Sequence, residues 1–223
     1  MPLILREAKL SDSARIGVIG ATAFADTVSL VVFPPHMRHL AKNGDAATEE
    51  AEWRATRNER RMKNGNPTFV VVDVAQDGTE QDIVGFAQWG LPKSKNPNQK
   101  SSQEVDHEST DAPPPSLDKE GLDELYGKLD AEVQKVLGEQ GADNMWYLMI
   151  LAVDPKQKRR GIGKMLINHG LSLAAKDNRD VFLAATPEGK HLYNSVGFQQ
   201  VGDPFDLGTV KHYSMLWKVD GSK

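Results

Sequence analysis

The sequence predicts an α/β (α+β) protein with one domain, residues 1–223. The expected core is a mixed, mostly antiparallel sheet of about six or seven strands with helices on both faces, because β-rich apolar runs alternate with segments of helical apolar spacing. With 39% hydrophobic and 26% charged residues, the 223-residue chain is also long enough for one well-packed domain.

The first 90 residues read as strand, helix, helix and hairpin. Ser11, Asp12 and Ser13 can cap a helix, because their side chains accept hydrogen bonds from its first amides. Residues 33–44 have proline at the entry and glycine at the exit, and they lead into a second helix. The expected elements are a strand at residues 3–6, a helix after these caps, a helix from about Ala47 to Lys63, and strands at 68–74 and 83–89 joined by a polar turn.

An insertion follows at about residues 92–138, between the third and fourth predicted strands. From Pro92 to Glu120 the composition shifts to Pro, Ser, Asn, Gln, Lys and Asp, which predicts a long surface loop. From Leu122 to Leu137 apolar residues recur at i, i+3, i+4 and i+7, which predicts an amphipathic helix that ends near Gly138. The insertion therefore combines a loose loop with a docked helix.

The next segment places a strand, a cationic glycine loop and a helix in immediate succession. The apolar strand Trp146–Val153 ends at Asp154-Pro155, because proline cannot continue it and restrains the preceding residue. Four cationic residues between positions 156 and 160 precede Gly161-Ile162-Gly163, where the helix begins. The first amides of a helix lack internal partners and lie at the positive end of its dipole, so the loop predicts a phosphate-bearing ligand.

Other interpretations of the glycine loop fit less well. A nucleotide-hydrolase phosphate loop needs a glycine where this chain has Lys158 and a Ser or Thr where it has Met165. A dinucleotide-binding fingerprint needs a third glycine at Leu166, although Asp180 matches its later acidic position. A nuclear-import or nucleic-acid patch is disfavoured, because the cationic run is short and lies inside a strand-to-helix turn.

The segment resembles motif A of the GNAT superfamily of acetyl-CoA-dependent N-acetyltransferases, whose Gln/Arg-x-x-Gly-x-Gly/Ala pattern follows a strand that ends in a Val-Asp-Pro-like turn. Lys158 stands where that family has Gln or Arg. Downstream, a predicted strand at 181–185 and the segment Pro187 to Phe198 resemble the family's short helix that ends in Leu-Tyr-x-x-x-Gly-Phe. The resemblance extends from about Leu3 to Val219 apart from the insertion.

This resemblance implies a GNAT fold, with acetyl-CoA as cosubstrate. The end of the strand is expected to bind the pantetheine arm and polarise the thioester carbonyl, because the family's strand bulges there and leaves amides unpaired. The glycine loop is expected to bind the pyrophosphate. The implied cofactor-binding residues are Leu151, Ala152, Val153, Lys158, Arg159, Arg160, Gly161, Ile162, Gly163, Lys164 and Asn194.

Aminolysis of a thioester needs amide donors for an oxyanion and a proton source for the thiolate. Tyr193 occupies the position of the family's acid, and a phenol with a pKa of about 10 can protonate a thiolate whose conjugate acid has a pKa of about 8.5. The alternative for Tyr193 is an aromatic residue that packs on the sheet. Many relatives place a glutamate where this chain has Tyr147, so no general base is assigned. Two alternatives stay open: Glu188 or Asp206 acting through water, or loss of the acceptor's proton to solvent without a dedicated base.

The predicted function is an N-acetyltransferase that transfers the acetyl group of acetyl-CoA to a primary amine by direct attack in a ternary complex. The alternative is a non-catalytic acetyl-CoA or CoA-binding module of the same fold; Tyr193 favours the enzyme. The expected partner is a small-molecule amine or a protein or peptide amine. In the insertion, Glu104, Asp106, Glu108 and Asp111 either attract a cationic amine to the acceptor entrance or belong to a solvated loop without substrate contact.

Composition narrows the partners further. The net charge of −4 does not support nucleic-acid binding, for which a basic footprint is expected. No run of 18 apolar residues exists and the N-terminus lacks signal-peptide features, so no membrane span and a cytoplasmic (intracellular) location are expected. The absence of cysteine excludes a cysteine acyl-enzyme, and His36 and His39 lack a third ligand, so no metal is predicted. A monomer or homodimer is expected.

Overall fold

The computed structural model describes residues 2–95, 112–208 and 210–219. Its strands form one sheet in the order β1-β2-β3-β4-β5-β8-β6, with β7 paired to β8 alone. All neighbouring pairs are antiparallel except β4 and β5, which are parallel. The strands are β1 (Leu3–Glu7), β2 (Thr68–Val74), β3 (Glu80–Gly90), β4 (Trp146–Val153), β5 (Val181–Ala185), β6 (Gln199–Gln200), β7 (Phe205–Leu207) and β8 (Val210–Trp217).

The mixed, mostly antiparallel sheet confirms the predicted fold class, and the differences lie at its C-terminal edge. A strand was expected from Phe198 to Gly202, but β6 keeps only two residues. Strand β7 was not expected, since its three residues are too few to show a period of two. With these two short strands the sheet has eight strands rather than six or seven.

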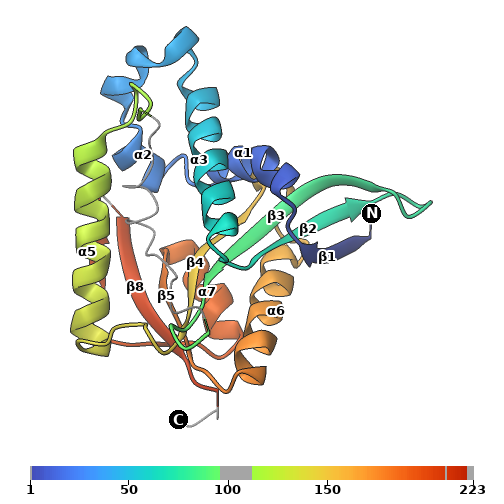
Figure 1. Ribbon diagram of the computed structural model, residues 1–223, viewed down its shortest axis with the longest axis vertical. Coiled ribbons are helices and arrows are strands. Elements are labelled where there is room, and N and C mark those ends of the chain that lie inside the picture. The colour runs from blue at the N-terminus through green and yellow to red at the C-terminus, as the bar shows by residue number, and fades with distance from the viewer. Residues whose placement is uncertain (1, 96–111, 209, 220–223) are drawn as a thin grey trace.

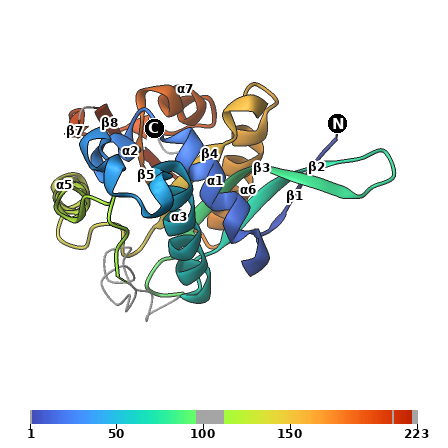
Figure 2. The ribbon, with the colours of Figure 1, turned by 90° about the horizontal axis from the view of Figure 1, so that it is seen from above.

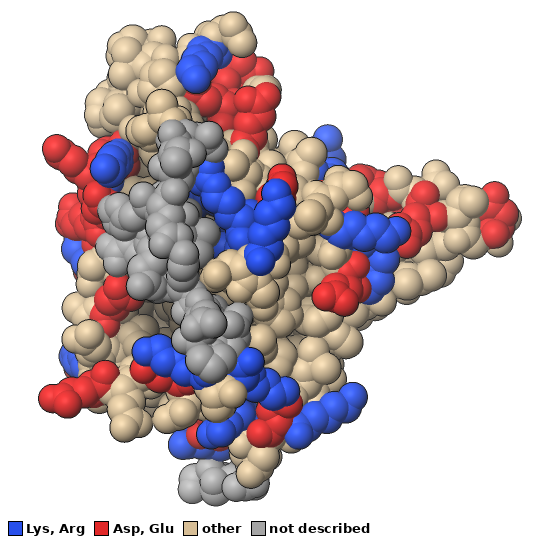
Figure 3. Space-filling model, in the orientation of Figure 1, with Lys and Arg blue, Asp and Glu red and all other residues tan. Residues whose placement is uncertain are grey.

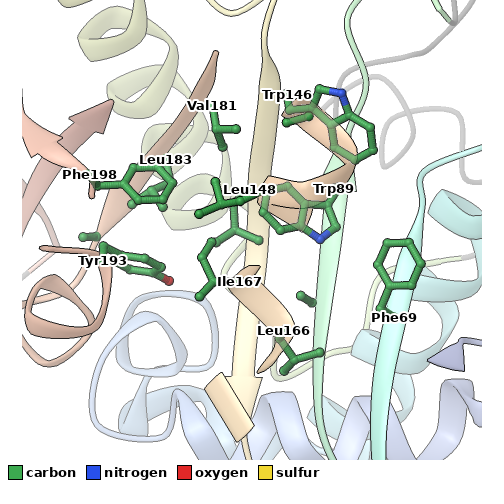
Figure 4. Close-up of a cluster of buried hydrophobic side chains, with 14 of the residues drawn as sticks. Phe69, Trp89, Trp146, Leu148, Leu166, Ile167, Val181, Leu183, Tyr193 and Phe198 are labelled. Atoms are coloured by element: carbon green, nitrogen blue, oxygen red, sulfur yellow. The ribbon is translucent and has the colours of Figure 1, made fainter. Parts of the chain in front are cut away.

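Helices cover both faces of the sheet (Figures 1 and 2). Figure 2 shows α6 and α7 on one face, and α1, α3 and α5 on the other. The helices are α1 (Ser13–Ala23), α2 (Val28–Val32), α3 (Ala46–Lys63), α5 (Lys119–Leu137), α6 (Ile162–Lys176) and α7 (Pro187–Ser195). The face under α6 and α7 holds the largest apolar core, which includes Trp89, Trp146, Leu148, Leu166 and Tyr193 (Figure 4).

The N-terminal helices follow the prediction with one addition. Helix α1 begins at Ser13, directly after a single 3₁₀ turn at Leu10–Asp12. Helix α2 was not predicted, and residues 33–44 form two short 3₁₀ turns, Pro35–Leu40 and Lys42–Gly44. The structure thus brings helix α2 beside α5 on the face opposite α6.

The insertion contributes helix α5, which begins at Lys119 and ends before Gly138, as the apolar spacing indicates. Gly138 has a positive φ of 80°, a conformation that glycine adopts without strain. Residues 96–111 of the predicted surface loop, with the four acidic residues 104, 106, 108 and 111, lie outside the described residues. The acidic-entrance hypothesis therefore stays a prediction.

Candidate active site

Strands β4 and β5 start as a parallel pair and then separate. Their paired residues are Trp146 with Val181 and Tyr147 with Phe182. The remaining residues of β4, up to Val153, pair with β3 alone. The separation leaves one edge of β4 open at its C-terminal end, in the middle of the sheet.

A β-bulge at Met149 redirects the backbone of β4. The register with β3 changes from Trp89 opposite Leu148 to Gln88 opposite Ile150, so Met149 is the extra residue. Such a bulge was expected at residues 151–153, and the structure places it two positions earlier. The side chain of Asn66, two residues before β2, donates hydrogen bonds to the Trp89 carbonyl (3.0 Å) and to the Met149 sulfur (3.4 Å), which support the bulge.

The bulge determines which amides of β4 face the opening. The Trp146 amide donates to a carbonyl just before β5, whereas the Asp154 amide donates to a carbonyl of β3. In a regular strand the amides of two residues eight positions apart point to the same side. The amides of Trp146 and Asp154 point to opposite sides because the bulge adds one residue between them. By the same alternation, the amides of Leu151 and Val153 point to the side that β5 has left, while the amide of Ala152 faces β3.

The cationic glycine loop leads from β4 into the N-terminus of α6. Asp154 accepts a hydrogen bond from the Lys156 amide (2.9 Å) and forms an ion pair with Arg15 (2.6 Å). These two contacts hold the start of the loop. Gly161 has φ +81°, and a Cβ added there would meet nothing within 4 Å. Gly161 and the first residues of α6, Ile162 to Lys164, also line a cavity, so the start of this helix borders open space, as an anion site requires.

Gly163 has a different role from Gly161. A Cβ at Gly163 would lie 3.0 Å from Leu192 of α7 and 3.8 Å from Leu151 of β4. The absence of a side chain at this position thus allows α6, α7 and β4 to approach each other closely. The second glycine of the motif therefore also determines how closely the elements around the site pack.

Arg160 holds the loop to the sheet. Its guanidinium donates to both carboxylate oxygens of Asp73 on β2, at 2.9 and 2.5 Å, and to Gln157 Oε1 at 2.6 Å. Asp73 is buried, and the hydrogen bond from Arg160 lowers the pKa of its carboxylate. Cofactor binding by Arg160 stays a prediction; in the structure its side chain contacts Asp73 of β2 and thereby holds the loop.

We expect Asp73→Asn to weaken acetyl-CoA affinity by roughly five- to tenfold, because a loop without its anchor must be ordered on binding. Calorimetric titration measures the affinity. In the wild-type protein the Asp73–Arg160 ion pair stabilises the fold at pH values above about 3.9, the pKa of an aspartate in the unfolded chain. This stabilisation is lost as pH falls through the lower pKa that Asp73 has in the folded protein. Glu80→Gln, which breaks the Arg6–Glu80 ion pair between β1 and β3 and involves no residue of the glycine loop, is the control. Equal affinities in both variants would contradict the anchor role.

The open edge of β4, the glycine loop and α7 surround one continuous cavity of about 1160 Å³. This volume exceeds the roughly 300–1,000 Å³ of a typical single-ligand pocket, so it has room for a cofactor and an acceptor. Among the described residues that line it, the predicted site residues are Leu151, Ala152, Val153, Lys158, Arg159, Gly161, Ile162, Gly163, Lys164 and Tyr193. Arg160 and Asn194 do not belong to this lining, and Asn194 is exposed on α7.

Tyr193 lies between the apolar core and the cavity. Its ring packs edge-on against Phe198 with centroids 5.7 Å apart, and its hydroxyl points away from Phe198 toward β4 (Figure 4). Burial raises the pKa of Tyr193 above the ordinary value of 10.0, so the phenol stays protonated at neutral pH. Both expected roles for Tyr193, a proton donor and a packing aromatic, are therefore compatible with its position.

The far end of the cavity has a cationic and aromatic wall that the sequence did not indicate. The guanidinium carbon of Arg57 lies 4.1 Å from the centroid of the Trp53 ring. Arg57 also donates a hydrogen bond to the Tyr126 hydroxyl, and Arg61 donates a second one at 3.3 Å. Arg54, one turn earlier on α3, is paired with a buried glutamate of the same helix. Figure 3 shows Lys and Arg gathered over the C-terminal half of α3. Helix periodicity places these arginines on one face, but only the fold brings α5 opposite them.

Tyr147 and Asp130 face this end of the cavity from β4 and α5. Burial, together with the charge of Asp130, raises the pKa of Tyr147 to about 12, and Arg61 acts in the opposite direction. Burial also raises the pKa of Asp130. Asp130 was missed because the contact between an inserted helix and β4 has no local sequence signal. Among the described residues, no three His, Asp or Glu side chains are grouped to hold a metal.

Comparison with known families identifies this arrangement. Residues 128–219, from the second half of α5 to the end of β8, match the family model described as Acetyltransferase (GNAT) domain. This part of the chain is therefore similar to the GNAT acetyltransferase domain. This match confirms the predicted resemblance to GNAT acetyltransferases over residues 128–219. No curated protein sequence matches the chain.

Solved structures with the same fold cover nearly the whole chain. The histone acetyltransferase HPA2 and related acetyltransferase from Corynebacterium glutamicum is 20% identical, with 98% of this chain and 97% of that chain covered and a TM-score of 0.58. The putative acetyltransferase yncA from Salmonella typhimurium, solved with its cofactor acetyl-CoA, is 16% identical over 98% and 94%, with a TM-score of 0.55. A phosphinothricin acetyltransferase from Sinorhizobium meliloti, in complex with AcCoA, is 14% identical over 97% and 87%, with a TM-score of 0.54. These structures share the GNAT fold with this chain.

Proposed function

We propose that the protein is an N-acetyltransferase that binds acetyl-CoA along the open edge of β4 and transfers the acetyl group to a primary amine. The observation that carries this proposal is the convergence of three features in one cavity: the amides of Leu151 and Val153, the N-terminus of α6 and the Tyr193 phenol. An acyl-CoA needs a hydrogen-bonding strand edge, a pyrophosphate site and a proton source at sulfur. The acetyl-CoA-bound structures of the Salmonella and Sinorhizobium proteins support the choice of cosubstrate.

Each group in the cavity has a role in the proposed reaction. The N-terminus of α6, with Lys158, Arg159 and Lys164 beside it, neutralises the pyrophosphate. The amides at the open edge of β4 bind the pantetheine arm and stabilise the negative charge that forms on the acetyl carbonyl oxygen. Tyr193 donates its proton to the thiolate as the carbon–sulfur bond breaks. The acceptor attacks directly, in a ternary complex, from the end of the cavity between α3 and α5.

The acceptor is a small molecule or a protein or peptide with a primary amine. The α3 wall, with its arginines and aromatic rings, and the carboxylate of Asp130 opposite offer contacts for both signs of charge. None of the described helices is long and apolar enough to cross a membrane. A cytoplasmic location remains part of the proposal, since the reaction consumes an intracellular thioester.

A panel of amines tests the function directly. Spermidine, 2-phenylethylamine, L-glutamate and an Nα-acetyl-lysine amide would each be incubated with acetyl-CoA and the protein, and released CoA and acetylated product would be measured by absorbance and mass spectrometry. We expect acceptor-dependent CoA release with stoichiometric acetyl-amine product. Acetyl-CoA binding without turnover of any amine would favour the non-catalytic module, and absence of acetyl-CoA binding would contradict both.

A further inference from the structure

His212 is a buried imidazole in the cavity that neither the motifs nor the proposed mechanism uses. It is 4% exposed and lies on β8, near the carboxyl end of β5. In the β5–β8 register Ala185 pairs with Tyr213, so His212 lies one position further along, beside Thr186 at the start of α7. Both His212 and Thr186 line the cavity, together with Tyr193 of the same helix.

His212 and Tyr193 lie on opposite faces of the sheet at β8, because Tyr193 belongs to the core that the next residue of β8, Tyr213, packs against. Tyr213 packs against the core under α6 and α7, with the Lys190 ammonium 3.8 Å from its ring centroid. Because neighbouring residues of a strand point to opposite faces, His212 points to the other face. There it packs against Phe205 of β7, with ring centroids 6.0 Å apart. This is the face that α5 covers and from which the acceptor is proposed to enter.

The hydrogen bond of His212 determines its tautomer. Nδ1 lies 3.0 Å from the Val210 carbonyl oxygen, which can only accept, so Nδ1 carries the proton. Nε2 then presents a lone pair, and no described residue donates a hydrogen bond to it. Burial lowers the pKa of His212 below 6.5, against the smaller opposite effect of the Val210 carbonyl, so the ring is neutral at pH 7.

We propose that His212 is the proton acceptor of the reaction, whose Nε2 takes the proton that the acceptor nitrogen loses as it is acetylated. This inference rests on the proposed acetyl transfer. The nitrogen–carbon bond forms and the carbon–sulfur bond breaks; the nitrogen-bound proton passes to Nε2, and the Tyr193 proton passes to sulfur. The imidazolium and phenolate then return to their neutral forms by proton exchange through water, so only the amide and CoA are released.

The basicity of His212 suits the intermediate rather than the free ammonium. After attack, the positively charged nitrogen is bonded to a carbon that carries oxygen and sulfur, which makes it more acidic than a free ammonium. A neutral imidazole can therefore accept this proton, whereas it would deprotonate a free ammonium only to a small extent. The free acceptor is expected to enter as the neutral amine.

The charged groups on the elements around His212 do not contribute to the shift of its pKa. Asp206 of β7 pairs with Lys211 of β8 at 3.4 Å. On α5, Glu132 lies 3.4 Å from the Ser214 hydroxyl, and Asp130 lines the cavity. On α7, Glu188 pairs with Lys158 of the glycine loop at 3.6 Å. None of these charges contributes to the lowered pKa, whose causes are burial and the Val210 carbonyl.

His212→Asn tests the proposal, because the asparagine amide can still donate to the Val210 carbonyl while Nε2 is lost. With the panel amine that turns over fastest, we expect kcat to fall roughly a hundredfold at pH 7.5 with little change in acetyl-CoA affinity. The control is His169→Asn, which removes a histidine whose pKa burial also lowers, on α6 and outside the cavity lining. Normal turnover by His212→Asn would overturn the proposal.

Two further measurements separate a proton acceptor from a structural histidine. The ratio of wild-type to His212→Asn kcat/KM cancels the titration of the acceptor amine, and it should fall toward one as pH drops below 6.5. Added imidazole should partly restore His212→Ala, measured against a reaction without acceptor amine. A pH-independent ratio, or no rescue of the folded His212→Ala protein, would contradict the role. If the wild-type protein acetylates no amine, the proposed function fails together with this inference.

Discussion

Gly161→Glu is expected to abolish acetyl-CoA binding at concentrations that saturate the wild-type protein. The glutamate would extend from a position that is now open, at the N-terminus of α6, into the proposed place of the pyrophosphate. A carboxylate about 5 Å from one phosphate charge costs roughly 3 kcal/mol at an effective dielectric constant of 20. That cost corresponds to a loss of affinity of more than about a hundredfold, which calorimetric titration would measure.

Gly78→Glu is the matched control for this substitution. Gly78 has φ +85° in the β2–β3 turn, against +81° for Gly161, and both positions have no heavy atom within 4 Å of an added Cβ. The two variants therefore share the backbone strain and the added charge and differ in their distance from the cavity. The proposed pyrophosphate site at the start of α6 would be contradicted by either of two results. One is wild-type acetyl-CoA affinity in Gly161→Glu, and the other is an equal loss of acetyl-CoA affinity in Gly78→Glu.

Tyr193→Phe is expected to lower kcat by roughly ten- to a thousandfold and to leave acetyl-CoA affinity nearly unchanged, as for the loss of one proton-transfer group. The ring, which makes the contact with Phe198, is retained, so the apolar core keeps its packing. Because burial raises the pKa of Tyr193, the phenol should stay protonated as pH rises beyond 10, and it should cause no loss of activity below that pH.

Tyr213→Phe serves as the control for Tyr193→Phe. Tyr213 is a partly buried phenol on neighbouring β8, packs against the same core and is not among the described residues that line the cavity. Steady-state kinetics with the same amine should show an unchanged kcat in Tyr213→Phe. If Tyr193→Phe turns over as fast as this control, Tyr193 is a packing residue and another group protonates the sulfur.

The proposed cofactor end of the site follows closely from the sequence because its signals are local. The strand that ends at Asp154-Pro155, the glycine at a positive φ and the helix that begins at Ile162 are neighbours in the chain, and each has its own residue preference. The exceptions are side chains whose direction depends on the fold. Arg160 turns to Asp73, which is 87 residues earlier, and Asn194 lies on the outer side of α7.

The acceptor end could not be predicted in the same way, because it is built from elements far apart in sequence. Tyr126 meets Arg57 across 69 residues, and Asp130 reaches the surroundings of Tyr147 only because α5 docks beside the sheet. The role proposed for His212 likewise depends on the β8 register and on a hydrogen bond to Val210. Periodicity predicted that these helices and strands exist, but it does not determine which of their faces meet.

Amide hydrogen exchange with and without CoA tests most directly where the cofactor binds. We expect protection, resolved residue by residue by NMR, at the amides of Leu151 and Val153 and at the first amides of α6, Ile162 to Lys164. The Ala152 amide, which faces β3, and the β2–β3 hairpin should exchange at unchanged rates. CoA binding without protection at Leu151, Val153 and the start of α6, or no binding at millimolar CoA, would contradict the site described for this protein.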